Sequence, residues 1–293
     1  MPAKPGIDHV VLCVRDLEAA RDRFHRMGFT TTPPARHPFG TGNSLVQMGA
    51  SFLELLTVVD AQRIPPHGED SFSFGAHNAA FLEEGQGMSM LVISSTDARA
   101  DEARWRAAGL RTFSPVYFER QATQPDGSRS KVAFTIAFAI DAQMPEAVFF
   151  CCQQHAPDAF WQAEYQVHAN GALDFDSVTL VAEHPASHAG FLEILLQRTP
   201  QVFKTGALSV ETGLGHLKVI APAQAPPRWG GVWSRCVGHG AQFAAAAITV
   251  ANLNTTARML ESGGVTVIAG QNRLTVPSTD CFGLALEFVQ PSA

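Results

Sequence analysis

The chain has 293 residues, of which 46% are hydrophobic and 16% charged, and its formal net charge is −6. This composition predicts a compact globular protein with enough length for two ordinary domains, and the lack of a basic excess argues against a nucleic-acid partner. No apolar run resembles a signal peptide or a membrane span and the five cysteines lack metal-knuckle spacing, so we expect a cytoplasmic protein with reduced thiols and no membrane partner.

A strand followed by a helix recurs four times along the chain. The first two copies are the clearest, because Asp16 and Asp97 stand where a helix N-cap is expected, and Gly28 and Gly109 close the helix after the same interval. The third copy is looser, and the fourth begins its helix at Asn252. The predicted units span about residues 6–60, 87–154, 173–222 and 242–290.

Several strand-like runs follow each helix, so each unit reads as strand, helix and then a group of strands. This order predicts an α+β fold of four βαβββ-type units, with the helices covering one face of each sheet. A doubly wound α/β sheet is disfavoured, because no crossover helix separates the later strands. We place the N-terminal half at 1–155, a connection at 156–172 and the C-terminal half at 173–293, and expect a long loop at 62–87.

A histidine and a glutamate interrupt two otherwise apolar strands of the first unit. His9 stands in "GIDHVVLCV" and Glu54 in "SFLELLTVV". Burying an unpaired carboxylate is costly, so Glu54 requires a metal ion or a close partner. His9 is either a metal ligand or a core residue with a hydrogen-bond partner, and the strand alone does not decide between them.

Four such units, paired two by two, resemble the vicinal oxygen chelate superfamily of glyoxalases, bleomycin-resistance proteins and extradiol dioxygenases. The stretch "RHPFGTGNSLVQMGASFLELL" is similar to the glyoxalase-like domain subgroup. The resemblance implies two incomplete-barrel halves, each with a cup that holds a divalent metal on first and last strands. By position it assigns His9 and Glu54 as ligands of Zn, Fe, Mn or Ni, with Glu54 also able to act as a catalytic base.

The other units depart from this ligand pattern. Met90 stands where the first unit has His9, and Ser177 and Ala245 hold the same place in the third and fourth units. Only Glu287 retains a carboxylate at a ligand position, and it is also interpretable as a structural residue. The residues at the family's ligand positions therefore do not complete a metal site of two histidines and one carboxylate.

A few polar residues near the first unit are candidates for the wall of the cup. We predict His37, Thr41, Asn43 and His155 as substrate-pocket residues, with His37 or His155 as a third metal ligand. The alternative for His37, Thr41 and Asn43 is local hydrogen bonding in a turn.

Three functions are compatible with these residues. The first is a metal-dependent lyase, isomerase or oxygenase that acts on a small carbonyl or vicinal-oxygen substrate in the N-terminal cup. The second is a metal-free protein that binds a small molecule in the same cup, and the third is a scaffold. Three or more converging ligands would favour the enzyme, and two or fewer in an apolar cavity would favour the binder. Either a monomer or a homodimer is compatible with four units in one chain.

Overall fold

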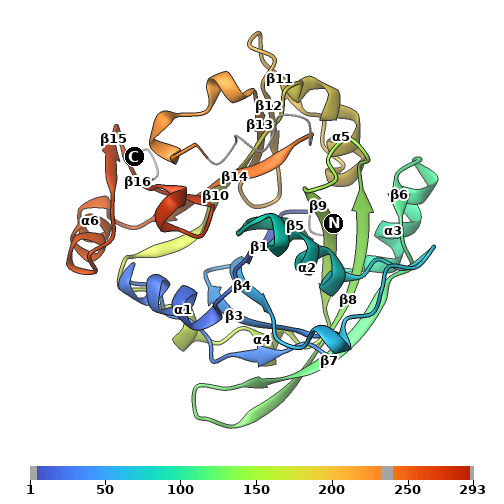
Figure 1. Ribbon diagram of the computed structural model, residues 1–293, viewed down its shortest axis with the longest axis horizontal. Coiled ribbons are helices and arrows are strands. Elements are labelled where there is room, and N and C mark those ends of the chain that lie inside the picture. Colours follow the sequence, from blue (N-terminus) through green and yellow to red (C-terminus); the bar gives the residue numbers. More distant parts are fainter. Residues whose placement is uncertain (1–4, 232–239, 291–293) are drawn as a thin grey trace.

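The computed structural model describes residues 5–231 and 240–290, so parts of the predicted halves 1–155 and 173–293 lie outside the described residues. Within the described residues, the strands form one nine-stranded and one eight-stranded mixed sheet, with helices between and beside them (Figure 1). This confirms the predicted α+β class and the pairing of four βαβββ-type units into two halves. No helix in these ranges combines the length and the apolarity needed to cross a membrane.

Each sheet is built around an antiparallel pair of strands that joins two units. At the centre of the first sheet β1 (Ile7–Cys13) pairs with β5 (Gly87–Ser94), and each has a parallel neighbour, β4 (Phe52–Val58) and β9 (Val148–Gln154). The second sheet repeats this arrangement with β10 (Ala172–Val181) and β14 (Gln242–Val250) at its centre, next to β13 (His216–Ile220) and β17 (Ala285–Val289). The remaining strands are β2 (Ala35–Arg36), β3 (Thr41–Gln47), β6 (Arg111–Thr112), β7 (Val116–Thr123), β8 (Arg129–Ile140), β11 (Gln201–Val202), β12 (Leu208–Glu211), β15 (Ile268–Gly270) and β16 (Arg273–Val276).

Three helices begin at the N-cap residues that the sequence predicts. The side chains of Asp16, Asp97 and Asn252 each accept hydrogen bonds from backbone N–H groups of the first helical turn. Figure 1 shows that the helices meet in pairs across the two halves, α1 beside α6 and α3 beside α5. The helices are α1 (Leu17–Arg26), α2 (Phe74–Glu84), α3 (Ala98–Ala107), α4 (Pro157–Phe160), α5 (Ala189–Leu196) and α6 (Leu253–Ser262).

Two elements differ from the sequence prediction. The expected loop at 62–87 contains the helix α2, whose start is capped by the Ser73 hydroxyl. The second unit also has an additional strand, β7, which forms a long hairpin with β8. The helix α2 lies against the first sheet, β7 extends that sheet beyond β8, and both provide walls for its open face.

The helix-covered faces of the two sheets share one hydrophobic core. Alternate residues of β1 divide between two clusters: Val10 and Leu12 join the large core that spans both halves, whereas Val11 and Cys13 join a separate cluster on the other face. Phe149 lies at the junction of the halves, with its ring centroid 5.4 Å from that of Phe243 in β14. The second cluster lies on the face of the first sheet opposite the shared core and lines its cup.

Phe149→Ala is expected to destabilise the whole chain, because this fully buried ring packs against both Phe191 and Phe243 of the C-terminal half. We expect a loss of roughly 3–5 kcal/mol in the free energy of unfolding, measured by urea denaturation. The matched control is Phe203→Ala, since Phe203 is 44% exposed and its removal should change stability little. A Phe149→Ala variant that unfolds with wild-type stability would contradict the shared core.

Candidate functional site

A cavity of about 440 Å³, counting its opening to solvent, lies on the cup face of the first sheet. Its walls are mostly aromatic, and a small polar group lies among them. Such a combination of apolar walls and few polar groups is typical of small-molecule sites. The lining residues are Phe39, Leu45, Phe52, Phe74, Phe118, Phe134, Ile136, Phe150, Cys152 and Phe160, together with the polar His9, His37, Asn43, Glu54 and Arg120.

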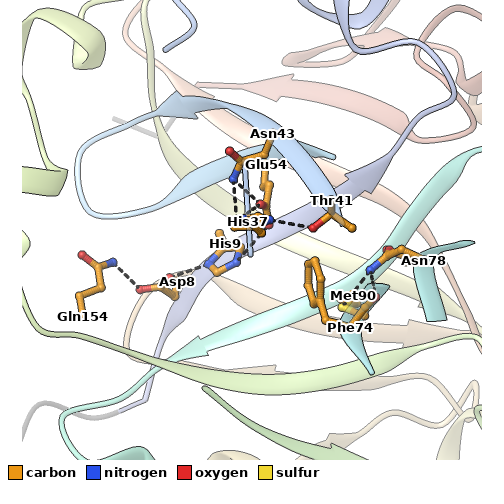
Figure 2. A network of polar contacts seen from close by, with 11 residues as sticks. Asp8, His9, His37, Thr41, Asn43, Glu54, Phe74, Asn78, Met90 and Gln154 are labelled. Atoms are coloured by element: carbon orange, nitrogen blue, oxygen red, sulfur yellow. Dashed lines mark hydrogen bonds and ion pairs between the residues drawn. The ribbon is translucent and has the colours of Figure 1, made fainter. Parts of the chain in front are cut away.

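The polar group is centred on the carboxylate of Glu54, which is 4% exposed. The Asn43 side-chain amide donates a hydrogen bond of 2.5 Å to Oε1. The Nε2 atoms of His9 and His37 lie 3.8 Å from Oε2 and Oε1, respectively. Figure 2 shows Glu54 between Asn43 and the two imidazoles. The carboxylate therefore has one close donor and two imidazoles beyond direct hydrogen-bonding distance.

The register of β3 and β4 brings Asn43 to Glu54. Leu45 pairs directly with Glu54, so Asn43 is its diagonal neighbour two residues along β3 and on the same face. His37 reaches the same point through a tight turn in which its N–H donates to the carbonyl of Thr41. Gly40 closes this turn with φ of +85°, and a Cβ there would lie 2.5 Å from the Asp60 carbonyl oxygen.

A β-bulge in β1 determines the environment of His9. The pairing of β1 with β5 shifts register between Ile7 and His9, which places the intervening Asp8 within reach of the same imidazole. His9 Nδ1 donates to Asp8 Oδ2 at 2.6 Å, so Nε2 is the nitrogen that faces Glu54. The ring also stacks on Phe52 with centroids 4.1 Å apart. The orientation of His9 is thus fixed by a carboxylate on one side and an aromatic ring on its face.

Burial dominates the electrostatics of the cup. It raises the pKa of Glu54, an effect that His9, the Asn43 hydrogen bond and Arg120 oppose in part. Burial, with Arg120 and His9 adding to it, holds the pKa of His37 well below its usual range, so the His37 ring is neutral. Burial also raises the pKa of the Cys152 thiol well above its ordinary value, which argues against a reactive cysteine in the cup.

Arg120 is a cavity residue that the sequence analysis missed. It lies on β7, where residues alternate between half-buried and exposed, and Phe118 and Arg120 share the inward face. An arginine at an inward position of an alternating strand was the available signal. Its buried Nε has no hydrogen-bond partner among the described residues, and neither has the buried Oδ1 of Asn43. The cavity therefore contains one unpaired donor and one unpaired acceptor.

The predicted site residues are brought together with one exception. His9, His37, Asn43 and Glu54 line the cavity, and Thr41 lies behind His37 with its Oγ1 2.8 Å from Nδ1. His155 is not a lining residue. Its N–H continues the pairing with β8, and its Nε2 lies 2.8 Å from the hydroxyl of Thr135.

The position of Thr135 explains why His155 is not in the cup. Phe134 and Ile136, on either side of Thr135, both line the cavity. Since side chains of a strand alternate between faces, Thr135 and the ring of His155 lie on the opposite face. The expectation that His155 contributes to the pocket is therefore corrected.

The second unit has no polar counterpart to this cluster. His9 pairs with Val92 and Val11 with Met90, so the pseudo-twofold axis relates His9 to Met90, as the sequence alignment placed it. On the parallel neighbours of these strands, Glu54 pairs with Val11 and Phe150 pairs with Val92, so the same axis relates Glu54 to Phe150. Glu54 and the polar side chains that surround it therefore come from the first unit, whereas the second unit contributes Phe150 and, from β7, Arg120 to the walls of the cavity.

The C-terminal half keeps a carboxylate at this position but neutralises it. By the same register Glu287 is the counterpart of Glu54 in the fourth unit, and Lys218 is its counterpart in the third. Glu287 accepts hydrogen bonds from Arg228 at 2.9 Å and from Arg273 at 2.8 Å. These two ion pairs neutralise the Glu287 carboxylate, which supports its interpretation as a structural residue.

The donor set of the first cup has one feature of a divalent-metal site but too few ligands. The contact of Asp8 with His9 is the kind that orients metal-bound imidazoles. Within residues 5–231 and 240–290, however, no group of three or more His, Cys, Asp or Glu side chains is placed to hold a metal ion. Oε1 of Glu54 is already bonded to the Asn43 amide. The residues present do not fit a metal held by three protein ligands, and the assignment of His9 and Glu54 as ligands stays a prediction.

Comparison with known proteins gives the family and the fold. A family model described as glyoxalase-like domain matches residues 7–196. A search of curated proteins found no match. A hypothetical protein from Staphylococcus aureus superposes with a TM-score of 0.69 at 11% identity, covering 98% of this chain and 99% of that one.

Two enzymes share the fold at similarly low identity. A mutant of 4-hydroxymandelate synthase from Streptomyces coelicolor gives a TM-score of 0.59 at 15% identity, over 99% of this chain and 93% of that one. A xylose isomerase-like TIM barrel/4-hydroxyphenylpyruvate dioxygenase fusion protein gives 0.60 at 12% identity, over 99% of this chain and 50% of that one. At these identities the likeness concerns the fold alone.

Replacing Glu54 with Gln is expected to change how stability depends on pH. Because the pKa of Glu54 is raised above its ordinary value of 4.5 in the folded chain, the folded state keeps a proton that the unfolded state releases. The wild type should therefore lose stability relative to Glu54→Gln as pH rises from about 4.5 through the folded pKa, measured by urea denaturation between about pH 4 and pH 8. Glu83→Gln, at an exposed site, is the control. A wild-type stability that stays level or rises with pH relative to that of Glu54→Gln would contradict the raised pKa.

Proposed function

Because the chain belongs to the glyoxalase-like domain family, we propose that its N-terminal cup is an active site for proton transfer on a small carbonyl substrate, with Glu54 as the acid–base group. The observation that carries this proposal is the buried Glu54 carboxylate, which lies among aromatic walls with its pKa raised. A carboxylate whose pKa moves toward neutrality is a better base at physiological pH than an exposed one.

The polar neighbours of Glu54 suit the charge that develops in such a step. Glu54 removes a proton from the carbon next to the carbonyl, and the C–H electron pair moves toward the carbonyl oxygen. The Asn43 amide nitrogen lies 3.3 Å from Nε2 of the neutral His37 and donates to it, so the ring proton is on Nδ1 and faces the Thr41 hydroxyl. The Asn43 amide is therefore the donor nearest to the base, and it can turn an N–H toward the oxygen as charge develops there. Return of the proton to the same carbon gives exchange. In a substrate with a hydroxyl on that carbon, delivery of the proton to the former carbonyl carbon, with transfer of the hydroxyl proton to the former carbonyl oxygen, gives the isomeric hydroxy carbonyl compound.

The alternative function is a protein that binds a small molecule without converting it. The specific observation that favours it is the cavity wall, where seven phenylalanines outnumber the polar residues. Such walls bind apolar ligands without any need for a base. The two functions differ in one respect that experiment can measure, since only the enzyme requires the carboxylate of Glu54 for turnover.

Glu54→Gln is expected to abolish proton exchange on the substrate. We would incubate aryl ketones and aldehydes such as phenylacetone with the protein in D2O and follow loss of the α-proton signal by NMR. Removal of the base should slow exchange by roughly 10²–10⁴-fold, while the amide keeps the shape of the cavity. Glu287→Gln, the same change at the equivalent strand position of the other cup, should exchange at the wild-type rate.

The arginine partners of Glu287 make a folding check of that control necessary, and the exposed Glu211→Gln is the substitute if it unfolds. Equal exchange by wild type and Glu54→Gln would exclude Glu54 as the base. Tight binding of these ligands with no exchange by either protein would establish the binding function instead.

Elemental mass spectrometry of protein purified without a His-tag tests the metal assignment. Because three side-chain ligands do not converge in the cup, we expect far less than one Zn, Fe, Mn or Ni ion per chain after growth with these metals. Near-stoichiometric metal that is lost in both His9→Ala and Glu54→Ala would overturn this expectation and make both residues ligands.

A further inference from the structure

Arg120 has a charge that the protein itself does not neutralise. Its Nη1 donates to the backbone carbonyl of Gln121 at 3.3 Å, and its buried Nε is unpaired within the described residues. The guanidinium also lies near the Phe134 ring, 5.8 Å from its centroid. Leaving a buried charged donor without a partner is costly, so its retention in an apolar cavity requires a compensating interaction.

The C-terminal cup shows two half-buried arginines that are paired with a buried carboxylate. There Arg228 and Arg273 both donate to the carboxylate of Glu287 at 2.9 Å or less. In the first cup, Glu54 and Arg120 line the same cavity, but no ion pair within 4.0 Å joins them among the described residues. The position that a carboxylate takes beside the arginines of one cup is therefore open beside Arg120 in the other.

The location of Arg120 indicates where a ligand's charge would lie. Arg120 lines the aromatic cavity and also two neighbouring pockets, one with Gln124 and Tyr165 and a more open one with Arg36 and Arg129. It therefore stands at the boundary between the cavity and solvent. A charged group bound there would keep part of its hydration, while the rest of the ligand would extend among the phenylalanines toward Glu54.

The charges of the cavity favour one negative charge on the part of the ligand that lies inside it. Arg120 is the one lysine or arginine among the lining residues, the His37 ring is neutral, and His9 already has the Asp8 carboxylate as its partner. The Glu54 carboxylate nearby disfavours a second negative charge on the ligand. A planar carboxylate matches the two-pronged donor geometry of a guanidinium, and it needs no further cation.

We propose that the substrate of the N-terminal cup is a monocarboxylate with an aromatic or branched apolar body, and that Arg120 selects it by binding its carboxylate. This inference rests on the proposed function and names the chemical class of its substrate. Arg120 determines specificity and takes no part in proton transfer.

Calorimetric titration of matched ligand pairs tests the proposal. Phenylacetate and 3-phenylpropanoate would be compared with phenylacetamide and 3-phenylpropanamide, which have the same shape and no charge. The wild type should bind at least one carboxylate about tenfold more tightly than its amide, and Arg120→Gln should reduce this ratio to about one. Arg120→Lys should retain part of the preference as a point charge, and it replaces Arg120→Gln if that variant fails to fold.

Two control variants separate this inference from the proposed function. Arg99→Gln removes an exposed arginine of α3 and should keep the wild-type ratio. Glu54→Gln should also keep the carboxylate preference, although it abolishes exchange. Equal binding of acids and amides by the wild type, or no binding of either acid at millimolar concentration, would overturn the role of Arg120 and leave the Glu54 result unaffected.

A carboxylate preference that depends on Arg120, found together with exchange that does not depend on Glu54, would support the ligand class and refute the catalytic role. A preference that persists in Arg120→Gln would mean that another group binds the acid, and the proposal would be wrong.

Discussion

The burial of one carboxylate, that of Glu54, is the constraint on which the cup of the first sheet depends. An ionisable group in an aromatic cavity is tolerated only if neighbouring donors compensate for the lost hydration. Asn43 does so from the adjacent strand, and His9 faces the other oxygen with Asp8 behind it. A slip of one residue between β3 and β4 would turn Asn43 to the opposite face. The same pairing that builds the sheet therefore also assembles the polar cluster.

The two cups show alternative solutions to the same problem. At equivalent strand positions the four units have Glu54, Phe150, Lys218 and Glu287. In the C-terminal half the carboxylate is satisfied by two arginines of its own chain, which leaves nothing for a ligand to bind. That half nevertheless contributes much of the large core, because its helix-covered face packs against that of the first sheet. The C-terminal half therefore adds to the shared core, while the N-terminal cup contains the unpaired Nε of Arg120 and the unpaired Oδ1 of Asn43.

The fold and the two central residues of the cup could be predicted from the sequence, whereas other residues of the site could not, for physical reasons. The repeated order of strand and helix determines the fold, and polar residues inside apolar strands mark His9 and Glu54 as unusual. Asp8 was missed because a bulge reverses the usual alternation of side chains, and a bulge has no signal in this stretch.

Arg120 was missed for a different reason, and His155 was misplaced for a related one. The strand β7 is an addition to the repeated unit, so the pattern that located the other strands did not extend to it. His155 follows the last strand of the second unit as expected, but the face to which its ring points depends on pairing with β8, which only the structure gives. Neighbours in sequence were predictable, whereas contacts across the sheet were not.

Arg120 and Glu54 are coupled through the low polarity of the cavity that both of them line. Arg120 favours the ionised form of Glu54 and so counteracts part of the effect of burial on its pKa. A carboxylate bound to Arg120 would neutralise that influence and add a negative charge of its own, and both changes raise the pKa of Glu54 further. The base would then become stronger when the ligand arrives and remain weaker in the empty cup. Because Glu54 is buried among the aromatic walls, this coupling is larger than the same pair of charges would show at a surface.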